Sequence, residues 1–271
     1  MIYVLDQNYL RSEELKNLVV SQPTLKFVLP DVAMLEMCKG HKWRETMQHS
    51  LETLAKVRGR VKQSISVGEA LNIELRNMKS VDGQLLRREF TNFIRSIMLD
   101  VKTNSDAGPG VSLIAVSIEK VQEDIRNAEL DHHRNQVSLT TRTEIIESAL
   151  GTTLLKQLKN DKIADDVRLA VIKKVAHELV QTFLEKQGYS QNRIKVFLKQ
   201  KPLLLRYFLL SVRHAFEWAK NGGIGSFPAE KVTNDILDQE YVIIASFFDG
   251  ILSKENRVNE ADAELRQLLR P

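Results

Sequence analysis

The chain has 271 residues, of which 43% are hydrophobic and 27% are charged, a profile typical of a soluble globular protein with one large domain or two small ones. No apolar run is long enough to span a membrane, and no basic region followed by an apolar segment opens the chain, so we expect a cytoplasmic protein without a membrane partner. The single cysteine, Cys38, excludes an internal disulfide. The net charge of +4 is compatible with an anionic partner but does not require one.

Two short strands are predicted in the first 40 residues. Residues 1–5 form a β-prone apolar run that ends at Asp6, and residues 26–29 form a second run that ends before Pro30. Ligands of α/β sheets bind outside the carboxyl ends of the strands. Asp6 is therefore in a suitable position for chemistry.

Two helices are predicted around these strands. The first starts at Ser12, which is its expected cap, and the second covers residues 32–39, with Asp31 as a plausible cap and Gly40 as its end. Glu36 stands out in the second helix because its neighbours are mostly apolar. A buried carboxylate must be paired or must bind a metal, so Glu36 is predicted to be a metal ligand or, alternatively, half of a salt bridge.

From residue 41 to about residue 221 the pattern is almost wholly helical. Apolar residues recur at helical spacing over residues 43–54, 86–97 and 167–183, without a fixed-period repeat that would indicate a solenoid. The glycine-rich residues 221–228 match neither a dinucleotide-binding fingerprint nor a P-loop and are interpreted as a connector. We therefore expect a core made of residues 1–40 and 226–271, with a helical insertion at residues 41–225.

Residues 234–255 are predicted to form an amphipathic helix, a turn at Asp249-Gly250 and a short buried strand. Asp235 and Asp238 are three residues apart at the expected helix entrance, and Glu255 lies just past the strand. Carboxylates at the ends of elements beside an apolar core suit Mg²⁺ or Mn²⁺, which prefer oxygen ligands. The alternative is that Asp235 and Asp238 are first-turn acids that interact with the helix dipole.

The two ends of the chain together resemble the PIN-domain nucleases, the family of the VapC-type toxins. The first motif corresponds to Val4-Leu5-Asp6-Gln7-Asn8 and the second to Leu35-Glu36-Met37-Cys38-Lys39-Gly40. The third and fourth correspond to residues 238–245, Asp249-Gly250 and Leu252-Ser253-Lys254-Glu255. The chain departs from the family pattern in having Glu in place of Asp at the fourth acid and a long insertion between the second and third motifs.

This resemblance implies an α/β fold with a PIN-like core, a short parallel sheet flanked by helices, and a large all-α insertion. It also implies a metal-dependent endoribonuclease. In such an enzyme Asp6, Glu36 and Asp238 would hold one or two Mg²⁺ or Mn²⁺ ions, and Glu255 would add a fourth carboxylate directly or through water. A bound ion relieves repulsion among carboxylates, lowers the pKa of its water and stabilises charge on the scissile phosphate.

Four more residues are candidates for supporting roles. Asn8 and Ser253 would orient a metal-bound water or a ligand carboxylate, with plain turn or cap chemistry as the alternative. Asp235 competes with Asp238 for the role of third ligand. Asp249 is expected to face solvent at the helix end, although it could also reach the site.

Binding of nucleic acid requires basic residues that neutralise phosphates away from the metal. Two basic runs are candidates for this role: Arg58, Arg60 and Lys62, and Arg193, Lys195 and Lys199. The alternative for both runs is a solvated helix face. We expect RNA as the substrate, with single-stranded or structured DNA, cleaved by the same carboxylates, as the alternative. A toxin or antiphage role with an inhibitor or antitoxin protein, and a homo-oligomer formed through the insertion, are further expectations. A catalytically inactive helical adaptor with the same fold is the alternative from a different class.

Overall fold

The computed structural model describes residues 1–103, 105, 108–130, 140, 144–145, 147–148, 151–158, 160 and 163–270. Its contacts divide the chain into two compact units, which are described separately. The sheet unit consists of Met1–Ala70, Asp82–Glu129 and Glu240–Asp262, and the helical unit consists of Leu71–Val81, Leu130–Gln239 and Ala263–Pro271. Within the described ranges, no helix has both the length and the apolar character that crossing a bilayer requires.

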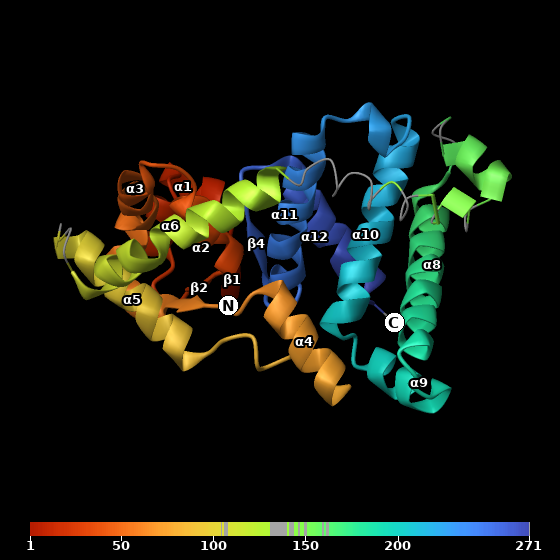
Figure 1. The fold of residues 1–271 in the computed structure, drawn as a ribbon, viewed down its shortest axis with the longest axis horizontal. Helices are drawn as coiled ribbons and strands as arrows, with labels where there is room; N and C mark the ends of the chain where they lie inside the picture. Colours follow the sequence, from red (N-terminus) through yellow and green to blue (C-terminus); the bar gives the residue numbers. More distant parts are fainter. Residues whose placement is uncertain are drawn as a thin grey trace. The chain divides into compact units, whose positions relative to one another are not determined.

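The sheet unit is built on a small, all-parallel sheet. In the described part of the chain its strands lie in the order β3-β2-β1-β4, with the bounds β1 (Ile2–Leu5), β2 (Lys26–Leu29), β3 (Val61–Gln63) and β4 (Gly250–Leu252). Tyr3 of β1 lies opposite Phe27 of β2 and Gly250 of β4. The first and last strands of the chain are therefore neighbours, as β1 and β4 in Figure 1 show. The fold is thus mixed α/β and mostly helical.

Helices flank this sheet. They are α1 (Glu13–Ser21), α2 (Asp31–Cys38), α3 (Trp43–Ala55), α5 (Arg88–Thr103) and α6 (Pro109–Leu130), with a 3-10 turn, η1 (Gln7–Tyr9), directly after β1. Helix α3 packs against α1, α2 and α5, and α5 also packs against β3. Phe27 of β2, Leu51 of α3 and Ile97 of α5 belong to one buried core, which holds the helices against the sheet.

Local signals placed the first elements correctly, apart from one cap. The hydroxyl of Ser12 accepts a hydrogen bond from the Leu15 N–H at 3.1 Å, which confirms Ser12 as the cap of α1. The stripe predicted over residues 43–54 is buried in α3. Asp31 is not a cap, because Pro30 occupies the cap position and Asp31 is already helical.

The region predicted to be wholly helical contributes a strand to the sheet. Residues 61–63 form β3, which pairs in parallel with β2, and the contacts place residues 43–70 and 82–129 with the sheet. A parallel pair needs a crossover connection, and α3 provides it between β2 and β3. A three-residue strand is too short for an alternating pattern to reveal, so helical periodicity on both sides hid it.

The helical unit contains a packed pair of long helices. Helix α8 (Asp165–Lys186) lies beside α10 (Leu203–Lys220), as Figure 1 shows, and α9 (Gln191–Lys199) packs against α8. The predicted α8 stripe is only partly correct. Val167 is 46% exposed, whereas the neighbouring Leu169 and Ile172 are buried. Residues four apart drift around a helix of 3.6 residues per turn, so an apolar residue at every fourth position leaves the buried face.

Three of the described helices have more than one residue in each unit. They are α4 (Val67–Asn77), α11 (Ala229–Ala245) and α12 (Asn256–Leu268). The last turns of α11, from Glu240 onwards, and the first turns of α12 belong to the sheet unit. The chain between these two parts turns over residues 246–249 and then forms β4 from Gly250, so the predicted order of helix, turn and strand is confirmed.

Candidate functional site

The carboxyl edge of the sheet gathers residues from distant parts of the chain. Because all four strands are parallel, their carboxyl ends meet at one edge. Asp6 directly follows β1 and Ser253 directly follows β4, while Asp31 and Ser64 follow β2 and β3. This edge is where the fold favours a binding site.

A chain of hydrogen bonds joins the β1 and β4 ends of this edge. Asp6 is only 5% exposed, and the Ser253 hydroxyl donates to its Oδ2 at 2.5 Å. The Glu255 N–H donates to Ser253 Oγ at 3.0 Å. Asn8 Nδ2 donates to Glu255 Oε1 at 3.1 Å, and Asn8 Oδ1 accepts from the Lys254 N–H at 3.0 Å. The structure therefore brings Asp6, Asn8, Ser253 and Glu255 together, although the two pairs lie at opposite ends of the chain.

The charges of this network affect the pKa of Glu36 of α2. Burial raises the pKa of the half-buried Glu36 carboxyl, a hydrogen bond from Tyr241 opposes the rise, and the charges of Asp6 and Glu255 increase it. The Tyr241 hydroxyl donates this bond to Glu36 Oε2. The Lys39 ammonium has a weaker lowering effect. The main partner of Glu36 is thus a hydroxyl rather than the salt bridge considered from the sequence.

Asp6 has a similar electrostatic environment. Burial raises its pKa, and the Glu255 carboxylate adds to the rise, while the Ser253 hydroxyl and the backbone of Asn8 and Gln7 oppose it. The neighbours that shift this pKa are therefore a hydroxyl, backbone groups and another carboxylate. Such an arrangement leaves excess negative charge that a cation would neutralise.

Asp235 and Asp238 lie in the interior of α11, where both are half-buried. The helix begins at Ala229, six residues before Asp235, so they are not first-turn acids. The alternative that they interact with the helix dipole is therefore wrong, because that effect fades beyond the first turn. Both residues belong to the helical unit, and their role as metal ligands stays a prediction.

Asp249 lies at the other edge of the sheet. Its Oδ2 accepts from the Ile2 N–H at 2.5 Å, and its own N–H donates to the Ile2 carbonyl at 2.9 Å. Ile2 begins β1 and Asp6 follows its end, which separates the two by roughly 13 Å along the strand. Asp249 is exposed, as expected, and it joins β1 to the start of β4 rather than contacting the acids.

The first basic run does not form a helix face. Arg60 donates to the carbonyls of Val19 and Gln22 at 2.9 and 2.8 Å, and its guanidinium lies 5.7 Å from the Phe27 ring centroid. It thus satisfies carbonyls at the end of α1. Arg58 lies in a 3-10 turn, η2 (Arg58–Arg60), and is exposed, while Lys62 is half-buried in β3.

The second basic run lies on α9 in the helical unit. Arg193, Lys195 and Lys199 are exposed. The Arg193 guanidinium lies 5.2 Å from the ring centroid of Tyr189, whose hydroxyl donates to the Leu75 carbonyl at 3.0 Å. Binding of nucleic acid by this face stays a prediction.

A second acidic pair was not anticipated from the sequence. Burial, and then the charge of Asp31, raise the pKa of Glu240 from 4.5 to about 7. Burial and the charge of Glu69 raise the pKa of Asp31, and Glu69 is itself paired with Arg87 at 2.7 Å. The signal that could have revealed this pair is a glutamate directly before the apolar run of residues 241–245. Tyr241 was missed in the same way, although a buried tyrosine hydroxyl needs a partner.

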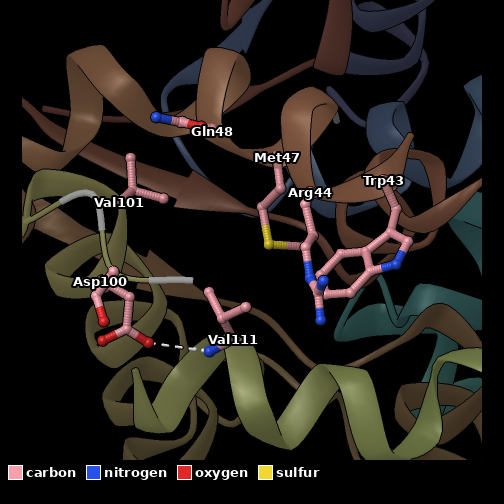
Figure 2. Close-up of a pocket in the computed structure, with 8 residues that line it drawn as sticks. Trp43, Arg44, Met47, Gln48, Asp100, Val101 and Val111 are labelled. Carbon is pink, nitrogen blue, oxygen red and sulfur yellow. Dashed lines mark hydrogen bonds between the residues drawn. The ribbon is translucent and has the colours of Figure 1, made fainter. Parts of the chain in front are cut away.

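A small pocket lies elsewhere in the sheet unit. Figure 2 shows Trp43, Met47 and Val111 on its walls and a dashed hydrogen bond from the Val111 N–H to Asp100. Asp100 also accepts from the Gly110 N–H at 2.7 Å, so its carboxylate caps the start of α6. None of the residues predicted for the acidic site lines this pocket, and its one buried carboxylate has a structural role.

The acids suit a hard divalent cation by their chemistry, because carboxylate oxygens with raised pKa values gather at Asp6 and Glu36. Within the part of the chain that the structure describes, however, no group of three or more His, Cys, Asp or Glu residues is arranged to hold a metal ion. Closing a ligand set around one ion would therefore require side-chain movement. In comparisons with protein-family models, curated proteins and solved structures, this chain has no significant match.

Proposed function

We propose that this protein is a metal-dependent nuclease with a PIN-like core, and that it cleaves RNA internally. The observation that carries the proposal is the hydrogen-bonded link from Asp6 through Ser253 to Glu255 and Asn8 at the carboxyl edge of a parallel sheet. Acids from both ends of the chain meet there, and the charge of Glu36 is coupled to theirs. A structural role alone does not require uncompensated acids at such an edge.

In this proposal Asp6, Glu36 and Glu255, which all belong to the sheet unit, hold Mg²⁺ or Mn²⁺. The bound ion supplies an acidified water and stabilises charge on the scissile phosphate. Ser253 keeps the Asp6 carboxylate in place, and Asn8 holds the carboxylate of Glu255. Carboxylates that lie close together repel one another, and a bound cation would relieve this repulsion.

The basic residues of the chain are proposed to bind phosphates of the nucleic acid. Exposed side chains that carry this part of the proposal are Arg58, Arg193, Lys195 and Lys199, with the half-buried Lys62 as a lesser candidate. Arg60 is left out because its guanidinium is occupied at the end of α1. RNA as substrate, a toxin or antiphage role, a protein inhibitor and a homo-oligomer rest on analogy with the PIN family.

A catalytically inactive adaptor with the same core is the second candidate. It is favoured by the lack of a group arranged to hold a metal among the described residues and by Glu255 in place of the family's Asp. In that case the acids would have no catalytic role, and the helical segments would bind a protein partner.

Cleavage assays with Mn²⁺ distinguish the two candidates. Labelled single-stranded RNA and DNA are incubated with the wild type, with Asp6→Asn and with Asp249→Asn. The last is a matched control, because Asp249 lies at the opposite sheet edge. We expect RNA cleavage that falls at least about 100-fold in Asp6→Asn and stays unchanged in Asp249→Asn. Activity that persists in Asp6→Asn, or no cleavage of either substrate with any divalent metal, would overturn the proposed nuclease.

A further inference from the structure

We infer that a basic surface of the helical unit, formed by α9 and the end of α4, binds single-stranded nucleic acid. This inference rests on the part of the proposed function in which α9 binds phosphates. It adds a second segment of the chain and the kind of strand, and it needs no metal ion. We call it the α4/α9 surface, and its basic residues are Arg76, Lys79, Arg193, Lys195, Lys199 and Lys201.

Two hydrogen bonds hold the end of α4 against α9. The Tyr189 hydroxyl, just before α9, donates to the Leu75 carbonyl of α4 at 3.0 Å. Just after α9, Gln200 Oε1 accepts from the Ser80 N–H at 3.0 Å. The paired residues are 114 and 120 positions apart in sequence. The two segments therefore lie side by side (Figure 1), with one contact at each end of α9.

These contacts add basic residues of the α4 segment to those of α9. Arg76 directly follows Leu75, and Lys79 directly precedes Ser80, so both lie next to a contact with the α9 segment. Both side chains are exposed. The exposed basic residues of α9 itself are Arg193, Lys195 and Lys199.

The positive charge of this surface is not balanced by nearby acids. Residues 186–216 contain no Asp or Glu, although the whole chain has 35. In the described parts of the chain, no ion pair involves the six basic residues of the surface. Glu185, before α9, accepts from the Gln191 amide at 3.4 Å, and Glu74 of α4 is fully buried. An exposed field of one sign attracts a polyanion.

Lys201 carries its charge at a backbone position that favours glycine. Its φ is 49°, in the left-handed region, and its N–H donates to the Leu198 carbonyl at 3.0 Å where α9 ends. Helices commonly end with a glycine in this conformation, because other side chains are strained there. The backbone therefore does not explain a lysine at this position, whereas binding of an anion does.

The side chains of α9 fit nucleic acid better than a membrane. A helix that lies in a membrane surface needs an exposed apolar face to insert. The apolar residues Ile194 and Phe197 are instead buried, and the 61% exposed Val196 lies among polar neighbours. Lys195 and Lys199 are four residues apart and so share one face of the helix. Such a row of cations suits the phosphates of a strand.

The contact between Arg193 and Tyr189 favours an unpaired strand. The guanidinium lies 5.2 Å from the centroid of the tyrosine ring, and the tyrosine hydroxyl is fixed by its bond to α4. A cation–π contact of this kind limits the positions of the guanidinium. Unpaired bases stack on aromatic rings and on guanidinium planes, whereas the bases of a duplex are already stacked on one another.

The test is the fluorescence anisotropy of labelled single-stranded RNA and single-stranded DNA, measured in EDTA. Lys195→Gln/Lys199→Gln should raise the Kd about tenfold, and the slope of log Kd against log salt concentration should fall by about 1.4 for two lost phosphate contacts. Lys42→Gln/Lys174→Gln is the matched control, because it removes two exposed lysines that have acid partners. Its Kd should not change.

Two single substitutions test the details of the surface. Arg193→Lys keeps the charge but removes the planar group. It should weaken binding of single-stranded DNA about fivefold and leave binding of an abasic strand of equal length unchanged. Lys201→Gly suits the left-handed backbone, so it should weaken binding without lowering the free energy of unfolding, which a urea curve measures.

The possible failures are distinguishable. An unchanged Kd in folded Lys195→Gln/Lys199→Gln, or an equal loss in the control, overturns the α4/α9 surface and leaves the acids of the proposed nuclease untouched. Tighter binding of a duplex of equal length overturns the assignment to single strands. Binding of phosphatidylserine vesicles but not of nucleic acid overturns the partner. Selective loss of binding in a protein that cleaves nothing with any divalent metal supports this inference and overturns the nuclease alone.

Discussion

Glu264 of the helical unit and the acids Asp6 and Glu36 of the sheet unit have opposite pKa shifts. In the helical unit, Glu264 accepts hydrogen bonds from Arg168 and Arg213, each at 2.5 Å. Burial disfavours its ionised form, but the hydrogen bond from Arg168 and the charge of Arg213 hold the pKa of Glu264 below its ordinary value. In the sheet unit, the pKa values of Asp6 and Glu36 are raised, first by burial and then by neighbouring acids.

Glu74 shows that hydrogen bonds alone do not compensate a buried charge. It is fully buried in the helical unit and accepts bonds from the N–H groups of Val81, Leu203 and Leu204. Burial still raises its pKa, although these bonds and the charge of Arg206 oppose the rise. The difference is that Arg168 and Arg213 donate hydrogen bonds directly to Glu264. The charge of a carboxylate paired with arginine is compensated within the protein. Acids paired with hydroxyls, backbone groups and one another keep an affinity for cations.

The largest expected effect is on the paired acid. Glu264→Gln should lower the free energy of unfolding by about 3 to 5 kcal/mol, because it removes the carboxylate that pairs with two largely buried arginines and leaves Arg168 with only the exposed Asp165 as an ion-pair partner. Urea unfolding at pH 7 measures this. The control is Glu260→Gln, an exposed acid one turn earlier on α12, which should change the free energy by less than about 0.5 kcal/mol. Equal effects of the two substitutions would show that the arginine pairs add little.

The next effect concerns Asp6 and Glu36, the acids at the carboxyl edge of the sheet. At a free Mn²⁺ concentration about 100-fold above the Kd, the free energy of unfolding of the wild type should rise by about 2.7 kcal/mol. Asp6→Asn should abolish this gain, since it removes a proposed ligand, and Asp249→Asn should keep it. Urea unfolding with and without Mn²⁺ gives both numbers. A full gain in Asp6→Asn would mean that the stabilising ion binds elsewhere.

Glu240 should make the free energy of unfolding depend on pH. The folded pKa of Glu240 is about 7 against an ordinary 4.5, so the folded state binds more protons in that range. Its contribution is present in full below about pH 4.5 and is lost as pH rises through about 7, a loss of up to roughly 3 kcal/mol. Glu240→Gln should therefore be more stable than the wild type at pH 8 but not at pH 4.5. Parallel pH profiles of urea unfolding without metal would contradict this assignment.

The smallest expected effect has a sign opposite to that of Glu264→Gln. In the presence of a chelator at pH 7, Asp6→Asn should raise the free energy of unfolding, on the order of 1 kcal/mol, because it removes a buried charge close to Glu255. Urea unfolding checks the sign. A clear loss of stability would mean that the bonds from Ser253 and the backbone to the ionised Asp6 outweigh its burial.

Much of this fold could be predicted from interactions between residues that are close in sequence. The runs at residues 2–5 and 26–29 are strands, and Ser12 caps α1. The closing helix and strand occur in the predicted order, although the helix begins at Ala229, before the predicted entrance at Asp235. These features depend on residues a few positions apart, so apolar spacing and cap chemistry reveal them. The same reasoning placed Asp6 and Glu255 at strand ends, and parallel strands then bring those ends to one edge.

The features that could not be predicted depend on contacts between residues far apart in the chain. The strand β3 exists because it pairs with β2, and the buried face of α8 is set by α10. Asp249 is held by Ile2, and Tyr241 by Glu36, across more than 200 residues. Whether a buried acid meets an arginine, as Glu264 does, or other acids is decided by which elements pack together. No local pattern contains that information, because a carboxylate looks the same in sequence whatever lies across from it in space.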